Sequence, residues 1–403
     1  MKYPEFEPLF SSPCQLILDT DIGPDCDDVG AVAVLYHMQK KYGFEVPAII
    51  NCTNNRYGCG VLDVLRRYCG APEHAIGLYT KAPFLEDCVK YNKEVSEKFS
   101  PALMDGTLPI TDSTELYGKI LSEAADKSVV ICTIGQFNAL ADAMKTYPDL
   151  FQTKVRGMVS MAGNYPEGKP EYNVYCDAQS AAYVFEHITF PVIFSGVEVG
   201  LAFRTGFTPE SNLPDNPLWL SYHLYTNGKN ANASFDLTAV QFAAEGYGDF
   251  YDLTDPVDVV VNPADGSETI TPNPDAPFRF MKIREGRTEA LASYLSAMVR
   301  EFRIISTQKS CLPTWQTAFC YEFTRLVGWR KASRRSRRRR CWSQRLPPQT
   351  APQRDPCIPK GQADRYHPIY THSFHFYVLA KINFTVSSSD QPWGQASERV
   401  FAL

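Results

Sequence analysis

The sequence predicts an α/β protein of the doubly wound, Rossmann-like kind, with a mostly parallel sheet covered by helices on both faces. First, apolar runs typical of buried strands alternate with segments of helical apolar spacing over residues 16–195. Second, five aspartates fall within ten residues directly after the first apolar run. Third, small or polar residues follow each of five predicted strands, namely Asp19 and Asp21, Asn54 and Asn55, Ile134 and Gly135, Asn164, and Gly196 to Glu198. Such strand ends form the ligand site of open α/β sheets.

Each predicted strand is a short run of mainly apolar residues. The runs lie, in order, at residues 16–18, 45–53, 74–79, 128–135, 155–161 and 190–195. Most are followed by a segment with apolar residues three and four positions apart, which predicts a helix. The predicted helices lie at 28–41, 57–69, 137–146, around 181–185, from 234 onward and at 288–305. Residues 86–126 are expected to be mostly helical, residues 207–233 rich in loops, and residues 256–290 a small β-rich region.

The composition favours a cytoplasmic protein with one sizeable core. The 403-residue chain is 44% hydrophobic and carries a net charge of −5, so its overall charge does not favour nucleic acid. No apolar run is long enough to span a membrane, and the first 15 residues lack the apolar core of a secretory signal. The 12 cysteines show no metal-type spacing, so we expect them to be mostly reduced and buried. A homo-oligomer is compatible with this composition.

The character of the chain changes after about residue 306. Residues 334–340 form a dense basic run, and residues 347–359 are rich in proline. We therefore expect residues 1–306 to form the α/β domain and residues 307–403 to form a poorly ordered tail. The basic run is interpreted as solvated, with a nuclear-localisation or polyanion-binding patch as the alternative. An incorrect gene model would also explain the abrupt shift.

The five aspartates between residues 19 and 28, here called the acidic loop, predict a cation site. Carboxylates this dense repel one another, and their burial is costly unless a cation shares the charge. Oxygen ligands suit Ca²⁺ or Mg²⁺ better than Zn²⁺. One or two of these acids would also serve as caps of the helix that follows, but capping does not use five.

Several motifs occur together in one order: the acidic loop, Asn54-Asn55, the turn at 133–135, Glu171 with Asn173, and the segment at 234–240. Together they resemble the nucleoside hydrolase family of the inosine–uridine-preferring type, over about residues 14–305. The resemblance implies a doubly wound fold with bound Ca²⁺. It also implies hydrolysis of an N-ribosyl bond to free base and ribose, with a small nucleoside as substrate in purine or pyrimidine salvage.

The resemblance also implies roles for individual residues. The expected metal ligands are Asp21, Asp28, Asp236 and the backbone carbonyl of Ile134. Asp21 is our candidate for the base that takes a proton from the attacking water, beside a metal that lowers the pKa of that water. The expected contacts to ribose hydroxyls come from Asp27, Asn55, Asn164, Glu171 and Asn173.

Two departures from the family pattern affect these roles. The acidic loop is longer than usual, which leaves the role of Asp25 open. Common members carry a histidine just before the aspartate matched to Asp236, whereas this chain has Phe235, which cannot protonate a leaving base. His223 is our candidate for that acid, with Tyr222 and Tyr225 as further candidates. An activated leaving group or an uncommon ribosyl compound would relax this need.

Two other functions compete with the hydrolase. A non-catalytic ribosyl-binding protein on the same fold is favoured by Phe235 and by the unusual tail. A Mg²⁺-dependent phosphatase of the haloacid dehalogenase type would use Asp19 as a nucleophile. That motif requires Thr or Val where Gly23 stands, and it leaves Asp236 without a role.

Overall fold

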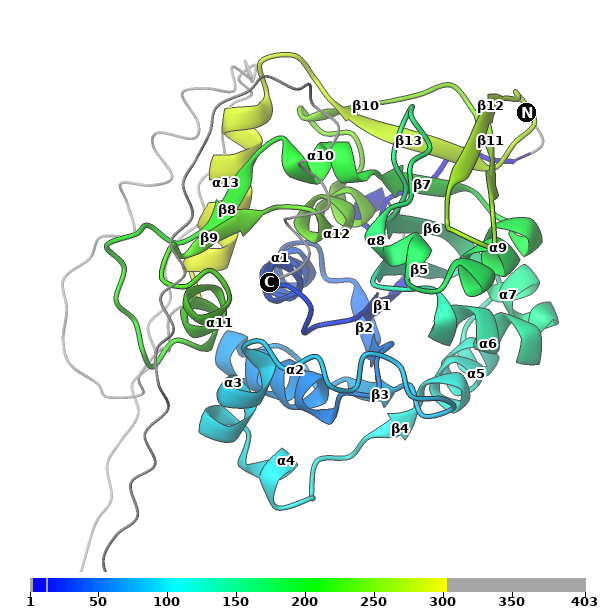
Figure 1. Ribbon diagram of the computed structural model, residues 1–403. Helices are drawn as coiled ribbons and strands as arrows, with labels where there is room; N and C mark the ends of the chain where they lie inside the picture. The colour runs from blue at the N-terminus through cyan, green and yellow to red at the C-terminus, as the bar shows by residue number, and fades with distance from the viewer. Residues whose placement is uncertain (1–2, 12–13, 303–403) are drawn as a thin grey trace, which may run out of the picture. The chain divides into compact units, whose positions relative to one another are not determined.

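The computed structural model describes residues 3–11 and 14–302 (Figure 1). The tail predicted for residues 307–403 lies outside this part of the chain. Within it, no helix is both long and apolar enough to cross a membrane. The strands of the main sheet are β1 (Gln15–Thr20), β2 (Glu45–Asn51), β3 (Ala75–Leu78), β4 (Thr111–Asp112), β5 (Val129–Ile134), β6 (Val155–Met161), β7 (Val192–Ser195), β10 (Tyr251–Leu253), β11 (Val257–Val261), β12 (Glu268–Pro272) and β13 (Phe278–Ile283).

The main sheet has the order β12-β11-β13-β7-β6-β5-β1-β2-β3-β4, with β10 paired to β13. The strands from β13 and β7 through to β4 pair in parallel, and β10, β11 and β12 add antiparallel pairs at one edge. A second, two-stranded sheet consists of β8 (Arg204–Gly206) and β9 (Ala231–Ala233). The predicted mostly parallel α/β sheet is confirmed.

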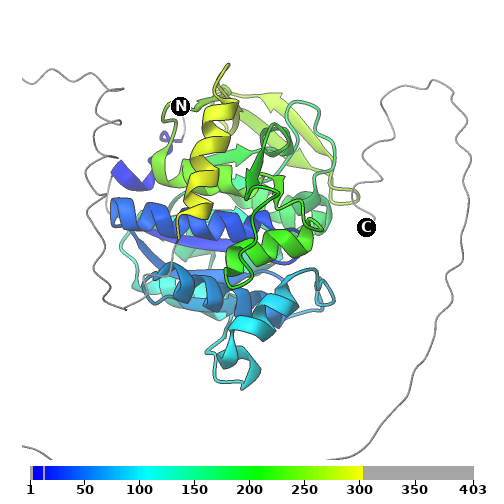
Figure 2. The ribbon, with the colours of Figure 1, turned by 90° about the vertical axis from the view of Figure 1, so that its left-hand side faces the viewer.

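Helices cover both faces of the sheet (Figure 2). They are α1 (Asp27–Tyr42), α2 (Arg56–Cys69), α3 (Asn92–Phe99), α4 (Pro101–Met104), α5 (Ser113–Glu123), α6 (Asn138–Thr146), α7 (Pro148–Lys154), α8 (Tyr172–Tyr175), α9 (Ala178–His187), α10 (Val197–Leu201), α11 (Pro217–Tyr225), α12 (Asp236–Glu245) and α13 (Thr288–Arg300), with a short 3₁₀ turn at Leu9–Ser11. Alternate residues of β1 enter two cores: Leu16 and Leu18 pack with α1, α2 and α12, and Ile17 packs with α5, α6 and α9. This division follows from the two-residue period of a strand.

The position of β1 explains why the acidic loop becomes the centre of the molecule. β1 lies between β5 and β2, and its last residue, Thr20, pairs with Ile134 on one side and Asn51 on the other. Parallel strands end at the same edge of a sheet, so the loops that follow these three strands meet there. The acidic loop then runs directly into α1, which packs against α12.

One helix was not predicted. Residues 207–233 were expected to be rich in loops, and within them Pro217–Tyr225 form helix α11. Asn216 caps it by accepting a hydrogen bond from the backbone N–H of Trp219, and Pro217 occupies the first turn, where its missing N–H costs nothing. This helix is apolar on all sides rather than amphipathic, so the residue spacing carried little helical signal. The last helix also ends earlier than expected, at Arg300.

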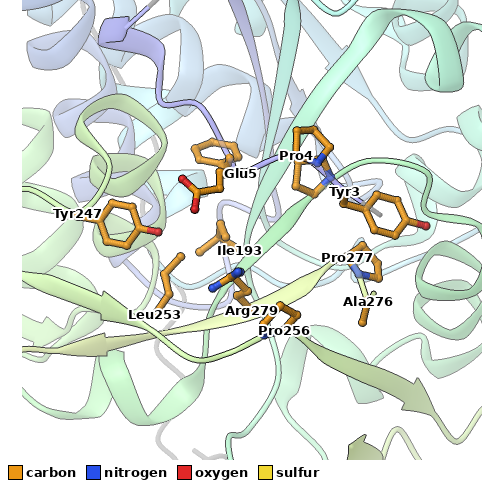
Figure 3. Close-up of a pocket in the computed structure, with 12 residues that line it drawn as sticks. Tyr3, Pro4, Glu5, Ile193, Tyr247, Leu253, Pro256, Ala276, Pro277 and Arg279 are labelled. Atoms are coloured by element: carbon orange, nitrogen blue, oxygen red, sulfur yellow. The ribbon is translucent and has the colours of Figure 1, made fainter. Parts of the chain in front are cut away.

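A hollow at the amino-terminal ends of β7 and β13 is too small to be the functional site. Figure 3 shows it between the N-terminal segment around Pro4 and the start of β7 near Ile193. Its volume is about 20 Å³, which holds about one water molecule. The functional site is therefore sought at the carboxyl ends of the strands.

Candidate metal and ribosyl site

Four of the five aspartates of the acidic loop are buried and Asp25 is half-buried, as a cation site requires and a solvated loop does not. Asp19, Asp27 and Asp28 are fully buried, and Asp21 is 4% exposed. Asp236, at the start of α12, is also 4% exposed. Within the described chain, none of these five residues forms an ion pair with Arg or Lys. The charge of this cluster is therefore not balanced by protein cations.

Three of these carboxylates converge, and we call them the aspartate trio: Asp25, Asp28 and Asp236. Each offers an oxygen atom, and these atoms lie within 4.8 Å of one another. Asp28 Oδ1 accepts a hydrogen bond from the Thr20 hydroxyl, whereas its buried Oδ2 has no hydrogen-bond partner in the described chain. Burial and mutual repulsion raise the pKa of Asp28 and of Asp236 well above the usual range. Closely spaced oxygens with an open buried acceptor fit a hard divalent cation.

Asp25, whose role the sequence left open, is thus a member of this trio, and Asp21 stands beside it. The Oδ2 of Asp21 accepts a hydrogen bond of 2.7 Å from the side-chain amide of Gln136. Burial raises the pKa of Asp21 to about 6, although the Gln136 hydrogen bond opposes this shift. The predicted roles of Asp21 as metal ligand and base stay predictions.

The predicted backbone ligand, Ile134, ends β5 next to Thr20. Gly135, which follows it, approaches the acidic loop so closely that a Cβ atom there would lie 2.6 Å from the backbone nitrogen of Asp21. Only glycine permits this approach without a shift of the backbone. The structure therefore brings the end of β5 against the acidic loop, while coordination by the Ile134 carbonyl stays a prediction.

Asp27 joins the two distant parts of the site. Its Oδ2 accepts hydrogen bonds from the backbone N–H groups of Phe235, at 2.8 Å, and Asp236, at 3.0 Å. These are the first donors of α12, which have no partner within the helix and favour a negative charge. The other oxygen of Asp27, Oδ1, is buried and has no partner in the described chain. One oxygen thus positions Asp236, and the second is open for the predicted ribose contact.

Asn55 borders the site at the end of β2, where it organises the backbone. Its amide donates to the carbonyls of Glu86 and Cys88, each at 3.0 Å, and its oxygen accepts from the N–H of Tyr57. Both N–H donors are therefore engaged in this conformation. A cleft of about 320 Å³ opens beside it, lined by residues 54–57 with Glu86, Leu103 and Met104. This volume lies in the range of small-ligand sites.

The remaining predicted ribose contacts gather on the loop after β6. Glu171 accepts hydrogen bonds from the N–H groups of Asn173, at 3.1 Å, and Gly163, at 3.3 Å, and burial raises its pKa to about 8. Asn173 accepts a hydrogen bond of 3.1 Å from Gln136, which links it to Asp21. Asn164 has a buried side-chain oxygen without a partner in the described chain. Gln136 thus links Asn173, and through it Glu171, to Asp21 of the acidic loop, while the ribose contacts of all three residues stay predictions.

His223, the candidate acid, is held elsewhere. It lies on α11 with its ring stacked on Trp219 at 4.3 Å, and Nδ1 hydrogen-bonds with the side chain of Asn230. No contact joins it to the acidic loop in the described part of the chain. Tyr225 is closer to this loop. Burial raises the pKa of Tyr225, and the nearby charge of Asp25 adds to the rise. The Tyr222 hydroxyl packs against Gly30 of α1.

Three polar residues of this region had no predicted role. Gln136 bridges Asp21 and Asn173, and its only signal was its place next to Gly135. Glu198 was noted only as a polar strand end, yet its carboxylate accepts the N–H of Tyr165. Glu268 lies on the distant β12 and accepts the N–H of Asn164 at 3.0 Å. The pairing of β12 with the loop after β6 was not visible in the sequence.

Fold and site together define a class: an α/β protein with a candidate divalent-metal site at the carboxyl ends of parallel strands, next to a set of buried polar groups. The chain belongs to the inosine-uridine preferring nucleoside hydrolase family, whose model matches residues 16–271, more than half of its length. The predicted family is thus confirmed, and the chain is an N-glycosyl hydrolase by family. Among curated protein sequences, none matches the chain.

Solved structures agree on the fold. An inosine-uridine preferring nucleoside hydrolase from Bacillus anthracis matches with a TM-score of 0.53 and 14% identity, over 71% of this chain and 99% of the other. An inosine-guanosine nucleoside hydrolase matches with a TM-score of 0.57 and 19% identity, over 71% and 98%. A purine-preferring ribonucleoside hydrolase from Gardnerella vaginalis matches with a TM-score of 0.53 and 18% identity, over 71% and 99%.

Proposed function

We propose that this protein is a Ca²⁺-dependent hydrolase that cleaves the N-glycosidic bond of a ribonucleoside to free base and ribose. The observation that carries the proposal is the convergence of the aspartate trio from two distant parts of the chain, beside a buried Asp21. Family membership supports the reaction class. Ca²⁺ is proposed rather than Mg²⁺ because it accepts six to eight oxygens in flexible geometry, which suits a site rich in carboxylates and open to ribose hydroxyls.

The residues that would hold the ion are the aspartate trio, with Asp21 and the Ile134 carbonyl as further ligands. When bound, the ion lowers the pKa of water and accepts sugar hydroxyls as ligands. Asp21 takes the proton from the attacking water, and Gln136 fixes the orientation of the Asp21 carboxylate. The open oxygens of Asp27 and Asn164, together with Glu171 and Asn173, bind ribose hydroxyls. Binding energy from these remote contacts then lowers the barrier at the anomeric carbon.

The test is a panel of purine and pyrimidine nucleosides, with free base and reducing sugar measured as products. We expect turnover that is lost after treatment with EGTA and restored by Ca²⁺ but not by an equal concentration of Mg²⁺. Release of phosphate from phosphate esters without base release would instead indicate the phosphatase. Saturable nucleoside binding without either product would indicate a ribosyl-binding protein.

A second prediction concerns Gln136, which touches both Asp21 and Asn173. Replacing it with alanine frees the Asp21 carboxylate to rotate and removes the link to the ribose contacts. We expect Gln136→Ala to lower kcat by about 10- to 100-fold, as is typical when a partner that orients a metal-site carboxylate is lost. Gln152→Ala, in helix α7, is the matched control. Equal kcat values for Gln136→Ala and wild type would show that Asp21 needs no such orientation.

A further inference from the structure

We propose that Glu198 is the general acid that protonates the leaving base as the N-glycosidic bond breaks. This inference rests on the proposed function and adds to it the residue that completes the reaction. Glu198 lies on α10, directly after the end of β7, at the same edge of the sheet as the acidic loop.

The chemistry requires such a residue. When the bond between the anomeric carbon and the base breaks, its electron pair stays on the base nitrogen, and protonation of the base stabilises the leaving group. Phe235 has no proton to give, and His223 is stacked on Trp219 and hydrogen-bonded to Asn230. Burial raises the pKa of Tyr222 and of Tyr225 above the ordinary value of a phenol, so both are poor proton donors near neutral pH. An acid on another element at the carboxyl edge of the sheet would meet this need.

Helix α10, which carries Glu198, packs against the residues just before Asp236. Gly200, two residues further along α10, is in close contact with the ring of Phe235, and its carbonyl accepts a hydrogen bond of 3.0 Å from the N–H of Ser234. These contacts fix α10 against the start of α12, where Asp236 lies (Figure 1). The short helix that carries Glu198 is thus held next to the start of the helix that supplies Asp236.

Glu198 itself contacts the loop after β6, which carries the predicted ribose contacts Asn164, Glu171 and Asn173. Its Oε2 accepts a hydrogen bond of 3.2 Å from the N–H of Tyr165. The N–H of Val197 donates to the carbonyl of Gly163, and the N–H of Gly163 in turn donates to Glu171. Two separate sets of contacts therefore connect the acidic loop with α10. One runs through Phe235 to Gly200, and the other runs through Gln136, Asn173, Glu171 and Gly163 to Val197. An acid on this helix and a base at Asp21 would then act on the glycosidic bond of one ligand held by these contacts.

The second oxygen of Glu198, Oε1, is available. It is buried and has no hydrogen-bond partner in the described chain. Gly196 makes room for the carboxyl group, because a Cβ there would collide with both of its oxygens. A protonated Oε1 needs an acceptor, and a ring nitrogen of the leaving base provides one.

The surroundings keep a proton on this group near neutral pH. Burial raises the pKa of Glu198 to about 7, and the carboxylate of Glu167 adds to the rise. Glu268 on β12 also faces it and is itself raised to about 7, chiefly by burial. Two lysines lie at this loop within the described residues: Lys169 belongs to the loop itself, and Lys282 of β13 has its Nζ over the Tyr165 ring at 5.2 Å. An acid with a pKa near the working pH is best suited to proton transfer.

The step balances in atoms and charge. The C–N bond breaks with its electron pair on nitrogen, and that nitrogen takes the proton from Oε1 of Glu198. The attacking water gives its hydroxyl group to the anomeric carbon and its proton to Asp21. Solvent then returns a proton to Glu198 and removes one from Asp21, so the net reaction is nucleoside plus water to ribose plus base.

The test compares Glu198→Gln with wild type on two substrates: the nucleoside that wild type cleaves fastest, and 4-nitrophenyl β-D-ribofuranoside, whose phenolate leaves without protonation. We expect Glu198→Gln to lower kcat on the nucleoside by about 100-fold, within the range of general-acid effects. KM should change little. On the nitrophenyl riboside we expect kcat within about threefold of wild type. The fall in nucleoside kcat at high pH, present in wild type, should be absent in the variant.

Glu186→Gln is the matched control, because it makes the same substitution at an exposed position of α9, and its kcat should match wild type on both substrates. Unchanged nucleoside turnover in Glu198→Gln overturns the assignment, and so does an equal loss on both substrates, which would indicate a structural role. A wild type that cleaves neither substrate overturns the proposed function itself.

Discussion

Replacing Asp236 with alanine is expected to abolish both metal binding and turnover. The trio loses one of its three oxygens, and Asp236 is the only member that comes from outside the acidic loop. A bound ion stabilises the transition state by several kcal/mol, so we expect kcat/KM to fall by at least about 10³-fold. Calorimetric titration of the chelator-treated protein with Ca²⁺ and the nucleoside assay measure the two effects.

Asp249→Ala is the matched control for this change. Asp249 is an exposed aspartate shortly after α12, and we expect its replacement to leave Ca²⁺ affinity and turnover within about twofold of wild type. If Asp236→Ala bound Ca²⁺ with wild-type affinity and kept its turnover, the ion would not be held by the trio, and the site assignment would be wrong.

The metal-free protein is expected to become less stable as the pH rises from about 5 to 8. Burial raises the pKa of Asp19 to about 7, of Glu171 to about 8 and of Glu268 to about 7. A carboxyl with a raised pKa binds its proton more tightly in the folded protein than in the unfolded chain. Its contribution to stability is complete below the unfolded pKa of about 4 and is lost as the pH rises through the folded value.

Each such carboxyl lowers the free energy of unfolding by about 1.4 kcal/mol per pH unit within this window. Urea unfolding at several pH values, in the presence of EGTA, measures the slope. Glu268→Gln removes one titrating group, so the free energy of unfolding should fall less steeply with pH, by the contribution of one carboxyl. A free energy of unfolding that is constant or rises over this range would contradict the prediction and would mean that these carboxyls are ionised at little cost in the folded protein.

Much of the fold was predictable because its strands are buried on both faces. Strands such as β5, with six buried residues of six, are read directly as apolar runs. The failure at α11 has the opposite cause. This helix is also buried, with Pro217 to Tyr222 all enclosed, so its residues lack the polar face that marks a surface helix. Burial on all sides gives a strand a recognisable apolar run, but it removes the apolar and polar periodicity by which a helix of nine residues would be predicted.

The candidate site was predictable where the chemistry is concentrated in sequence. Five aspartates in ten residues require an explanation on their own, and Asp236 followed from the family resemblance. Glu198 and Glu268 are single carboxylates whose surroundings come from other elements. Glu198 meets the loop after β6 at Tyr165, and Glu268 meets the same loop at Asn164. Their environment depends on tertiary contacts, which residue spacing does not encode.

The two hydrogen bonds that Asp27 accepts from the start of α12 join positions more than 200 residues apart. The candidate ion site therefore forms only after the beginning and the later part of the domain have met. Luminescence from a lanthanide bound at this site would consequently report the formation of the native state in a refolding experiment. The luminescence would rise at the last stage of folding, when the secondary-structure signals have already reached their final values.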